Sequence, residues 1–256
     1  TTVPHVRDTI ADRELEIWAL LDVTPSMNWG TEGVTKRDLG IAAIATIGFL
    51  TQQMGDRFGG LIMRPDKLNR IPARSGRMAL YGLLRRMLTE PIVHDHAEGS
   101  LDLAAGIEAM ARTQRRRGLR VVVSDFLSPG DTELDPAVEP DWERPLRRMG
   151  VRNQVLCIEV ADRRELEFPD VGDILIRGPE SDFQRYVNTS DDGARARFDA
   201  AASAQRERIR VAIRRAGAGH IALRTDRDWV YDIARFVLAY RRTAAMLHQP
   251  PQGVSV

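Results

Sequence analysis

Three oxygen-bearing side chains follow an apolar run near the start of the sequence, at intervals of two residues. The run at residues 17–21 ends in Asp22, and Thr24 and Ser26 come next. Pro25 keeps the backbone of the residue before it out of the helical region, so the three side chains can point toward one position. One carboxylate and two hydroxyls are hard oxygen donors of the kind that Mg²⁺ and Ca²⁺ bind. The pattern therefore predicts part of a metal site.

Two further oxygen donors are predicted close to the same position. An apolar run at residues 119–124 ends in Asp125, and Ser100 precedes an amphipathic helix. In open α/β sheets, ligands bind at the carboxyl ends of the strands, so three separate loops can supply oxygen atoms to one cation. We therefore predict a metal site formed by Asp22, Thr24, Ser26, Ser100 and Asp125.

The elements that must position these residues alternate between strands and helices. Apolar runs predict sheet strands at residues 17–21, 57–63, 68–73, 119–124, 154–160 and 220–224, and helical spacing predicts helices at residues 36–54, 77–88, 101–117, 142–149, 191–216 and 228–242. This alternation predicts an α/β fold with a doubly wound, mostly parallel six-stranded sheet of the Rossmann type and helices on both faces. The strand order 3-2-1-4-5-6 would make the strands that end in Asp22 and Asp125 neighbours at the topological switch point.

The remaining segments predict the domain organisation. We expect one domain at residues 15–243, preceded by a lead-in segment at residues 1–14 that is truncated upstream and followed by a flexible tail at residues 244–256. A β-hairpin insertion is predicted near residues 171–188. Turn-forming residues at 28–33 predict a flexible surface beside the metal site. Residues 128–143 contain three prolines and six acidic residues, which predicts a solvated loop.

Composition excludes several classes of protein. The chain has 37 basic and 36 acidic residues, so its net charge of +1 creates no overall field that would attract nucleic acid or an anionic membrane. The single cysteine, Cys157, lies in an apolar run and cannot form an internal disulfide, which fits a reducing compartment. No apolar stretch has the length and the lack of charge of a membrane span. We therefore predict a cytoplasmic protein.

The site motifs resemble those of a known family. The Asp-x-Thr-x-Ser pattern at residues 22–26, the pair Gly99-Ser100 and the strand-end pair Ser124-Asp125 occur in this order. Together they resemble the metal-ion-dependent adhesion site of von Willebrand factor A domains. The resemblance implies a von Willebrand factor A-like fold.

The segments at residues 2–7 and 223–229 make the resemblance more specific. With them, the chain resembles the bacterial A-domain proteins of domain-of-unknown-function family 58, which are encoded beside MoxR-type AAA+ ATPases. The resemblance implies a non-catalytic, metal-dependent protein interaction module that acts as an adaptor or chaperone partner of the ATPase in complex assembly or maturation. It implies Mg²⁺, with Ca²⁺ or Mn²⁺ as alternatives, bridging to an Asp or Glu of the ATPase or of its client. Neither nucleic acid nor a membrane span is expected.

Each site residue also has an ordinary structural explanation. The hydroxyls of Thr24, Ser26 and Ser100 are suited to cap the helices that follow them. Asp125 is suited to form an Asx turn at the end of its strand. The metal site is therefore favoured by the combination of residues and not by any one of them.

Three other functions are alternatives. A magnesium-dependent phosphatase or phosphotransferase of the haloacid-dehalogenase kind also begins with an aspartate at a strand end, but its chemistry needs a second carboxylate where this chain has Thr24. His94 and His96 suggest a zinc site, although no further ligand cluster is evident. The arginines at residues 115–117 and those at residues 206–215 could bind the phosphates of nucleic acid, but the even charge balance favours a solvated or partner-facing surface.

Overall fold

The structure is a computed structural model, and it describes residues 15–31, 33–51, 56–92, 101–113, 116–127, 138–177 and 184–236. Its main sheet contains β1 (Glu16–Asp22), β2 (Arg57–Met63), β3 (Leu68–Ser75), β4 (Gly118–Ser124), β5 (Gln154–Ala161) and β8 (Gly219–Arg224). The strand order is β3-β2-β1-β4-β5-β8, with every neighbouring pair parallel except β2 and β3. Because β8 is the sixth strand of this sheet along the chain, the predicted α/β fold and the strand order 3-2-1-4-5-6 are confirmed.

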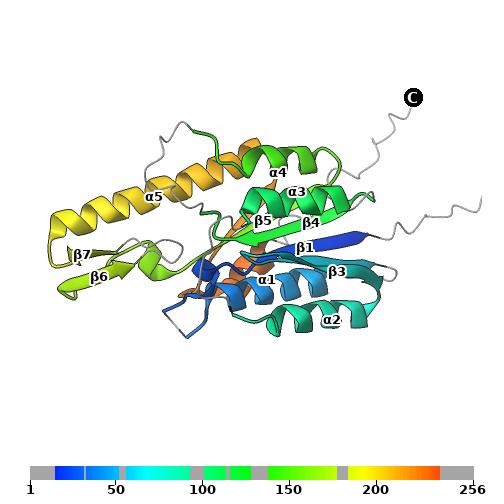
Figure 1. Cartoon of the computed structure of the whole chain (residues 1–256), viewed down its shortest axis with the longest axis horizontal. Coiled ribbons are helices and arrows are strands. Elements are labelled where there is room, and N and C mark those ends of the chain that lie inside the picture. Colours follow the sequence, from blue (N-terminus) through cyan, green and yellow to red (C-terminus); the bar gives the residue numbers. More distant parts are fainter. Residues whose placement is uncertain are drawn as a thin grey trace, which may run out of the picture.

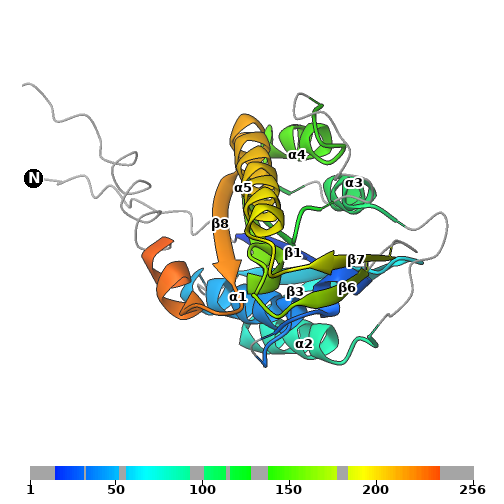
Figure 2. The ribbon, with the colours of Figure 1, turned by 90° about the vertical axis from the view of Figure 1, so that its left-hand side faces the viewer.

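Helices cover both faces of the sheet (Figures 1 and 2). One face carries α1 (Lys36–Thr51) and α2 (Arg77–Leu88), and the other carries α3 (Leu103–Thr113), α4 (Glu143–Gly150) and α5 (Asp192–Arg215). Two short 3-10 helices, η1 (Pro25–Asn28) and η2 (Arg163–Glu165), follow β1 and β5. Residues 229–236 are also helical. Sequence periodicity placed these helices within a few residues of their observed bounds.

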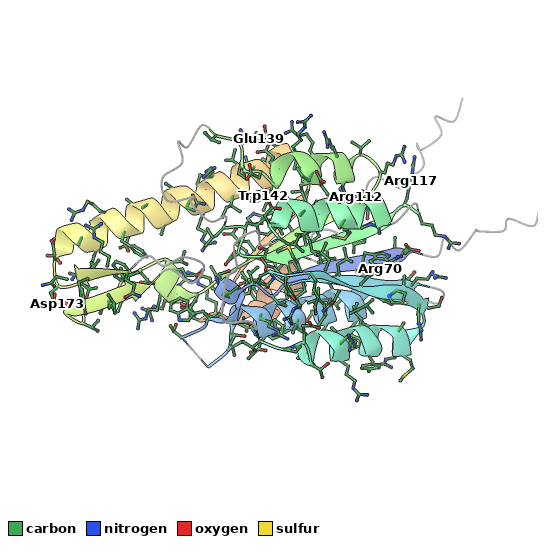
Figure 3. The ribbon with its side chains drawn as sticks, viewed as in Figure 1. Arg70, Arg112, Arg117, Glu139, Trp142 and Asp173 are labelled. Atoms are coloured by element: carbon green, nitrogen blue, oxygen red, sulfur yellow. The ribbon has the colours of Figure 1, made fainter. Side chains whose placement is uncertain are left out.

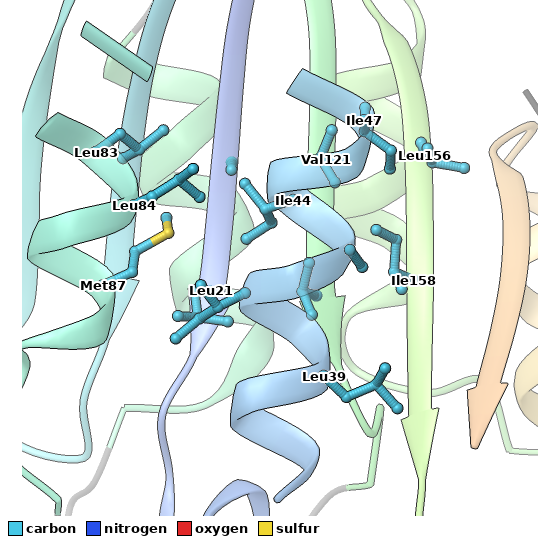
Figure 4. Packing of buried hydrophobic residues seen from close by; sticks show 14 of the residues in the cluster. Leu21, Leu39, Ile44, Ile47, Leu83, Leu84, Met87, Val121, Leu156 and Ile158 are labelled. Atoms are coloured by element: carbon cyan, nitrogen blue, oxygen red, sulfur yellow. The ribbon is translucent and has the colours of Figure 1, made fainter. Parts of the chain in front are cut away.

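The central strands are buried because they are covered on both faces. All seven residues of β1 and of β4 are buried, which is what their continuous apolar runs predict. Figure 4 shows α1 lying across one face of the sheet, with Leu39 and Ile47 among the core side chains. Gly60 of β2 lets α2 pack closely on the same face, since a Cβ atom at Gly60 would lie only 2.6 Å from Leu83 Cδ1 of α2.

A smaller hairpin lies apart from the main sheet. Its strands β6 (Asp173–Arg177) and β7 (Gln184–Asn188) pair in antiparallel fashion, as predicted. The hairpin lies beside the amino-terminal part of α5 (Figures 1 and 2). Figure 3 places Asp173 at the opposite end of the molecule from Arg70 and Arg117. Because the buried residues of α5 all belong to its carboxyl-terminal half, the hairpin and the first half of α5 form an arm that extends beyond the sheet.

The prediction of a solvated loop at residues 128–143 is wrong for its last two residues, Trp142 and Glu143. Trp142 is only 1% exposed, and its ring packs edge-to-face against Phe126 with 5.1 Å between ring centroids. Glu143 is also buried, and it accepts a hydrogen bond of 2.7 Å from Arg215. Packing of α4 against α5 therefore covers a segment whose composition alone indicated exposure.

Several predictions lie outside the described residues. These are the lead-in segment, the tail, the His94 and His96 pair, Ser100 and the end of the last predicted helix. Cys157 is described, and it is buried with a free thiol, as expected for a residue in the core. None of the helices in the described ranges has the length and apolarity needed to cross a bilayer.

Candidate functional site

The site begins where β1 and β4 end side by side. The two strands are parallel neighbours, with Leu21 opposite Val123. Ser124, which lies 102 residues after Asp22 in the sequence, donates a hydrogen bond of 2.7 Å from its Oγ to Asp22 Oδ2. Asp125 follows directly. The structure therefore brings together the two strand ends that the sequence predicted to be neighbours.

The loop after β1 turns its hydroxyls back toward Asp22. Thr24 donates from its backbone N–H at 2.9 Å and from its Oγ1 at 2.7 Å, both to Asp22 Oδ1. The Oγ atoms of Thr24 and Ser26 are 3.3 Å apart. Thr24 occupies the N-cap position of η1, yet its side chain makes no capping hydrogen bond. The capping explanation for Thr24 is therefore wrong, because its hydroxyl is committed to Asp22.

Asp125 has three kinds of partner. Its Oδ1 accepts a hydrogen bond of 3.1 Å from the backbone N–H of Leu127, so the Asx turn is confirmed. Ser26 also hydrogen-bonds to the carboxylate, which joins the two loops. The Lys36 ammonium donates to Oδ2 at 2.8 Å. The turn and the site are not exclusive, since one carboxylate has lone pairs for both.

The backbone beside Asp125 is strained. Phe126 has a φ of +59°, a left-handed conformation that is costly for a bulky residue. Its N–H donates to Ser124 Oγ at 3.0 Å, and its fully buried ring packs against Trp142. No sequence signal marks this residue, because positive φ is expected only at glycine and, less often, at asparagine or aspartate.

Lys36 is the site residue that sequence reasoning missed. It is the first residue of α1 and is completely buried, with its Nζ 2.8 Å from Asp125 Oδ2 and 2.5 Å from Glu165 Oε1. One signal was present: Lys36 and Lys67 are the only lysines in a chain whose other basic residues are all arginine. A compact ammonium can be enclosed between two carboxylates where a planar guanidinium would need more room.

Burial and charge act in opposite directions on these groups. The pKa of Asp22 is raised to about 7, first by burial and then by the Asp125 carboxylate, against the hydrogen bonds that Asp22 accepts. Burial also acts to raise the pKa of Asp125, but the Lys36 ammonium and the hydrogen bonds from Leu127 and Ser26 together outweigh burial, and the pKa lies below its ordinary value. Burial acts to lower the pKa of Lys36, yet its two carboxylate partners raise it above the ordinary value. Asp125 therefore has an internal cation beside it, and the Asp22 carboxylate does not.

The donor set fits a hard divalent cation. The four predicted ligands that the structure describes offer two carboxylates and two hydroxyls, all at most 7% exposed, and such ions prefer oxygen donors. No group of three or more His, Cys, Asp or Glu side chains suited to a metal occurs in the described part of the chain. An ion here would therefore depend on hydroxyl oxygens as well as on carboxylates, as the sequence predicts.

Comparison with known families decides the identity of the chain. Residues 1–208 match the family described as "Protein of unknown function DUF58". The chain belongs to the DUF58 family. It is 44% identical over 249 residues to "Uncharacterized protein Rv1480" of Mycobacterium tuberculosis, covering 97% of this chain and 74% of that protein. It is 42% identical over 177 residues to "Uncharacterized protein MAV169" of Mycobacterium avium, covering 69% of this chain and 97% of that protein.

Solved structures show a similar fold. An aerotolerance-related membrane protein from Bacteroides fragilis matches this DUF58 chain with a TM-score of 0.50 and 12% identity, over 89% of this chain and 99% of that one. The von Willebrand factor A domain of SpRpn10 matches with a TM-score of 0.44 and 13% identity, over 95% of this chain and 100% of that one. At these identities the likeness concerns the fold alone.

A charged network continues from the site of this DUF58 chain into α5. Arg206 of α5 donates to Glu159 Oε1 at 3.0 Å, to Glu165 Oε2 at 3.5 Å and to the backbone oxygen of Asp125 at 3.3 Å. His220 lies 2.8 Å from the other oxygen of Glu159. The expectation of a solvated or partner-facing surface is therefore wrong for Arg206, whose side chain is only 18% exposed.

Three further arginines of α5 have partners. Arg210 pairs with Glu207 at 2.5 Å, Arg215 pairs with Glu143, and Arg208 donates to the backbone oxygen of Val138. The expectation of a solvated or partner-facing surface holds for Arg210 and Arg215, whose side chains are 50% and 54% exposed.

The loop beside the site is tied down at one point. Thr31 donates to Asp162 from its backbone N–H at 2.9 Å and from its Oγ1 at 2.8 Å. Asp162 also accepts from the Thr225 hydroxyl, at 2.7 Å, and from the N–H of Arg164. The turn-rich segment was expected to form a flexible surface, but Asp162 holds Thr31 to the ends of β5 and β8.

Proposed function

We propose that this DUF58 chain is a non-catalytic, metal-dependent protein interaction module. The observation that supports this most directly is the meeting of Asp22, Thr24 and Ser26 with Asp125 at the ends of two neighbouring strands. Buried carboxylates and hydroxyls that share hydrogen bonds form an ordered oxygen-donor set, and Mg²⁺ is the cation it suits best. Ca²⁺ and Mn²⁺ are alternatives, because these ions share the preference for oxygen donors.

The ligand shell of the site favours a further anionic ligand from a partner. Asp22 and Asp125 carry two negative charges when ionised, and the Lys36 ammonium beside Asp125 is itself balanced by Glu165. A bound divalent cation would therefore be neutralised, but the predicted ligands supply fewer than the about six oxygen atoms that such an ion takes. We propose that an Asp or Glu side chain of a partner protein completes the shell, so that the cation bridges to such a carboxylate.

Each residue then has a definite task. Asp22 and Ser26 hold the cation, with Ser100 as the expected third contact from the loop outside the described residues. Asp125 orients Ser26, and Thr24 orients Asp22 by donating twice to the same carboxylate oxygen. Nothing in this arrangement resembles a paired acid and nucleophile, because the position of the second carboxylate required by the phosphatase alternative is occupied by Thr24.

We propose a MoxR-type AAA+ ATPase, or the client on which it acts, as the partner. The resemblance in sequence supports this choice, and the fold supports the more general role of an interaction module. In this proposal the module works in the cytoplasm, where the ATPase has access to ATP. Its contribution would be to hold the client or the ATPase while a complex is assembled or matured.

The test is binding of the purified ATPase to variants of the chain. Asp22→Ala should weaken binding at least tenfold in Mg²⁺, and EDTA should weaken binding of the wild type to the same extent, because both remove the bridge. Asp66→Ala is the matched control, since Asp66 is an exposed carboxylate in the turn between β2 and β3. Equal affinity of wild type and Asp22→Ala, with and without EDTA, would show that no metal bridge contributes.

A further inference from the structure

Lys36 is shared between two carboxylates that belong to different parts of the fold. Asp125 follows β4 and belongs to the candidate metal site, whereas Glu165 belongs to η2 after β5. The Lys36 Nζ lies within hydrogen-bond distance of both, at 2.8 Å from Asp125 and 2.5 Å from Glu165. The Lys36 side chain is completely buried, so water cannot replace either partner without a change in packing.

Glu165 is held in place independently of Lys36. Its Oε2 accepts a hydrogen bond of 3.0 Å from the backbone N–H of Asp162, completing the capping box of η2. Arg206 of α5 also reaches the same oxygen, at 3.5 Å. Glu165 can therefore keep its position and serve as the sole acceptor for the ammonium if Asp125 becomes unavailable.

The Asp125 carboxylate cannot stabilise two neighbouring cations at once. A divalent cation held by Ser26 and Asp22 would lie close to the Asp125 carboxylate, because Ser26 hydrogen-bonds to it. Like charges a few ångströms apart in a buried site repel strongly, since the surroundings screen them poorly. The ammonium of Lys36 and the cation would therefore compete for the same carboxylate.

We propose that Lys36 is a built-in competitor of the metal: its ammonium neutralises Asp125 while the site is empty of metal and passes to Glu165 when a cation binds. This inference rests on the proposed metal site and adds a residue that sets its affinity. It also connects the site to α5, because Glu165 contacts Arg206. No covalent step is involved, and the ammonium keeps its proton throughout.

Isothermal titration with Mg²⁺ tests the proposal. Lys36→Met should bind Mg²⁺ at least tenfold more tightly than wild type, because the competing charge is gone. Glu165→Gln should bind at least tenfold more weakly, because the ammonium then has only Asp125 as an anionic partner. Glutamine can still accept the capping hydrogen bond from the N–H of Asp162, so η2 is preserved.

A double variant separates this proposal from a general charge effect. If Glu165 acts through Lys36, the loss caused by Glu165→Gln should shrink at least threefold in the Lys36→Met background. An unchanged loss in that background would show that Glu165 attracts the cation directly, and the transfer of Lys36 would be refuted. Glu143→Gln is the control variant. It removes the charge of another buried glutamate, which pairs with Arg215 and not with Lys36, and it should leave Mg²⁺ affinity unchanged.

The outcomes also distinguish this inference from the proposed function. If the wild type binds no Mg²⁺ at millimolar concentration, the metal-dependent function itself fails. If the wild type binds Mg²⁺ and both single variants bind equally well, only the role of Lys36 fails. Should Lys36→Met not fold, as judged by circular dichroism, Lys36→Gln replaces it in the single and the double variant, and the same outcomes support or overturn the competition.

Discussion

At the scale of single residues, the site depends on side chains that orient other side chains. Ser124 was recognised in the sequence only as part of a strand-end pair, yet its Oγ donates to Asp22 Oδ2 and accepts from the N–H of Phe126. It therefore fixes the carboxylate and stabilises the strained residue beside Asp125. Such supporting residues commonly matter almost as much for metal affinity as the ligands themselves.

Ser124→Ala is expected to lower Mg²⁺ affinity by about 10- to 100-fold, because Asp22 loses a donor that holds it in position. The free energy of unfolding should also fall, by about 1–3 kcal/mol, since a buried N–H loses its acceptor. Titration calorimetry and urea unfolding measure the two effects. Thr46→Ala is a matched control, because Thr46 bonds only to Ala42 within α1. An unchanged Mg²⁺ affinity in Ser124→Ala would contradict the orienting role.

At the scale of elements, Asp162 joins three segments that are distant in the sequence. Its carboxylate accepts hydrogen bonds from Thr31 after η1, from Arg164 in η2 and from Thr225 after β8. Burial acts to raise the pKa of Asp162, but these hydrogen bonds outweigh it and the pKa lies below its ordinary value. The ionised form therefore stabilises the rim of the site.

Asp162→Asn is expected to lower the free energy of unfolding by about 2–4 kcal/mol at pH 7, because an amide nitrogen replaces one acceptor oxygen. A depressed folded-state pKa gives stability that is present above the unfolded pKa, about 4, and is lost as the pH falls through the folded value. The difference between wild type and variant should thus shrink at low pH. Urea unfolding from pH 7 to pH 2 measures it, with the exposed Asp199→Asn as control. A constant difference over this range would refute the assignment.

At the scale of the whole molecule, the chain combines a packed sheet with a lightly packed arm. The buried residues of α5 are Ile209, Ala212 and Ile213, all in its second half. In the described structure, the hairpin strands β6 and β7 pair with each other and not with the main sheet. A stacked pair of rings, Phe168 and Phe198 with centroids 3.6 Å apart, joins the segment before the hairpin to α5. The arm therefore buries little apolar surface against the main sheet.

Hydrogen exchange should report this difference directly. Amides in the first half of α5, residues 194–204, are expected to exchange at least tenfold faster than those at residues 207–215, because local opening costs less where little apolar surface is buried. Phe198→Ala should increase exchange further in the arm while the sheet strands keep their protection. Equal protection along the whole of α5 would show that the arm is as stable as the core.

The local features of the site were predictable from the sequence. The strand ends at Asp22 and Asp125 were visible because a buried parallel strand must be a continuous apolar run, and a carboxylate interrupts it abruptly. The alternation of strands and helices then restricted the topology, since parallel neighbours need crossover helices. Whether a metal binds remains a prediction that the titrations above address.

The long-range features were not predictable in this way. Lys36 meets Asp125 and Glu165, which lie 89 and 129 residues further along the chain, and no periodicity encodes such a meeting. Arg206 belongs to an arginine-rich helix that resembled a solvated surface, yet packing of α5 against the sheet directs it to buried carboxylates. The positive φ of Phe126 likewise arises from contacts and not from residue type.

The sequence by itself determined the fold class, the strand order and the grouping of the Thr24 and Ser26 hydroxyls near Asp22, because short-range spacing and hydrophobic burial dictate these features. Only the tertiary structure decided that the ammonium of Lys36 is enclosed between Asp125 and Glu165. The physical reason is that a buried charge takes whichever opposite charges the folded chain brings within a few ångströms of it, and that proximity exists only after the sheet and its helices have packed.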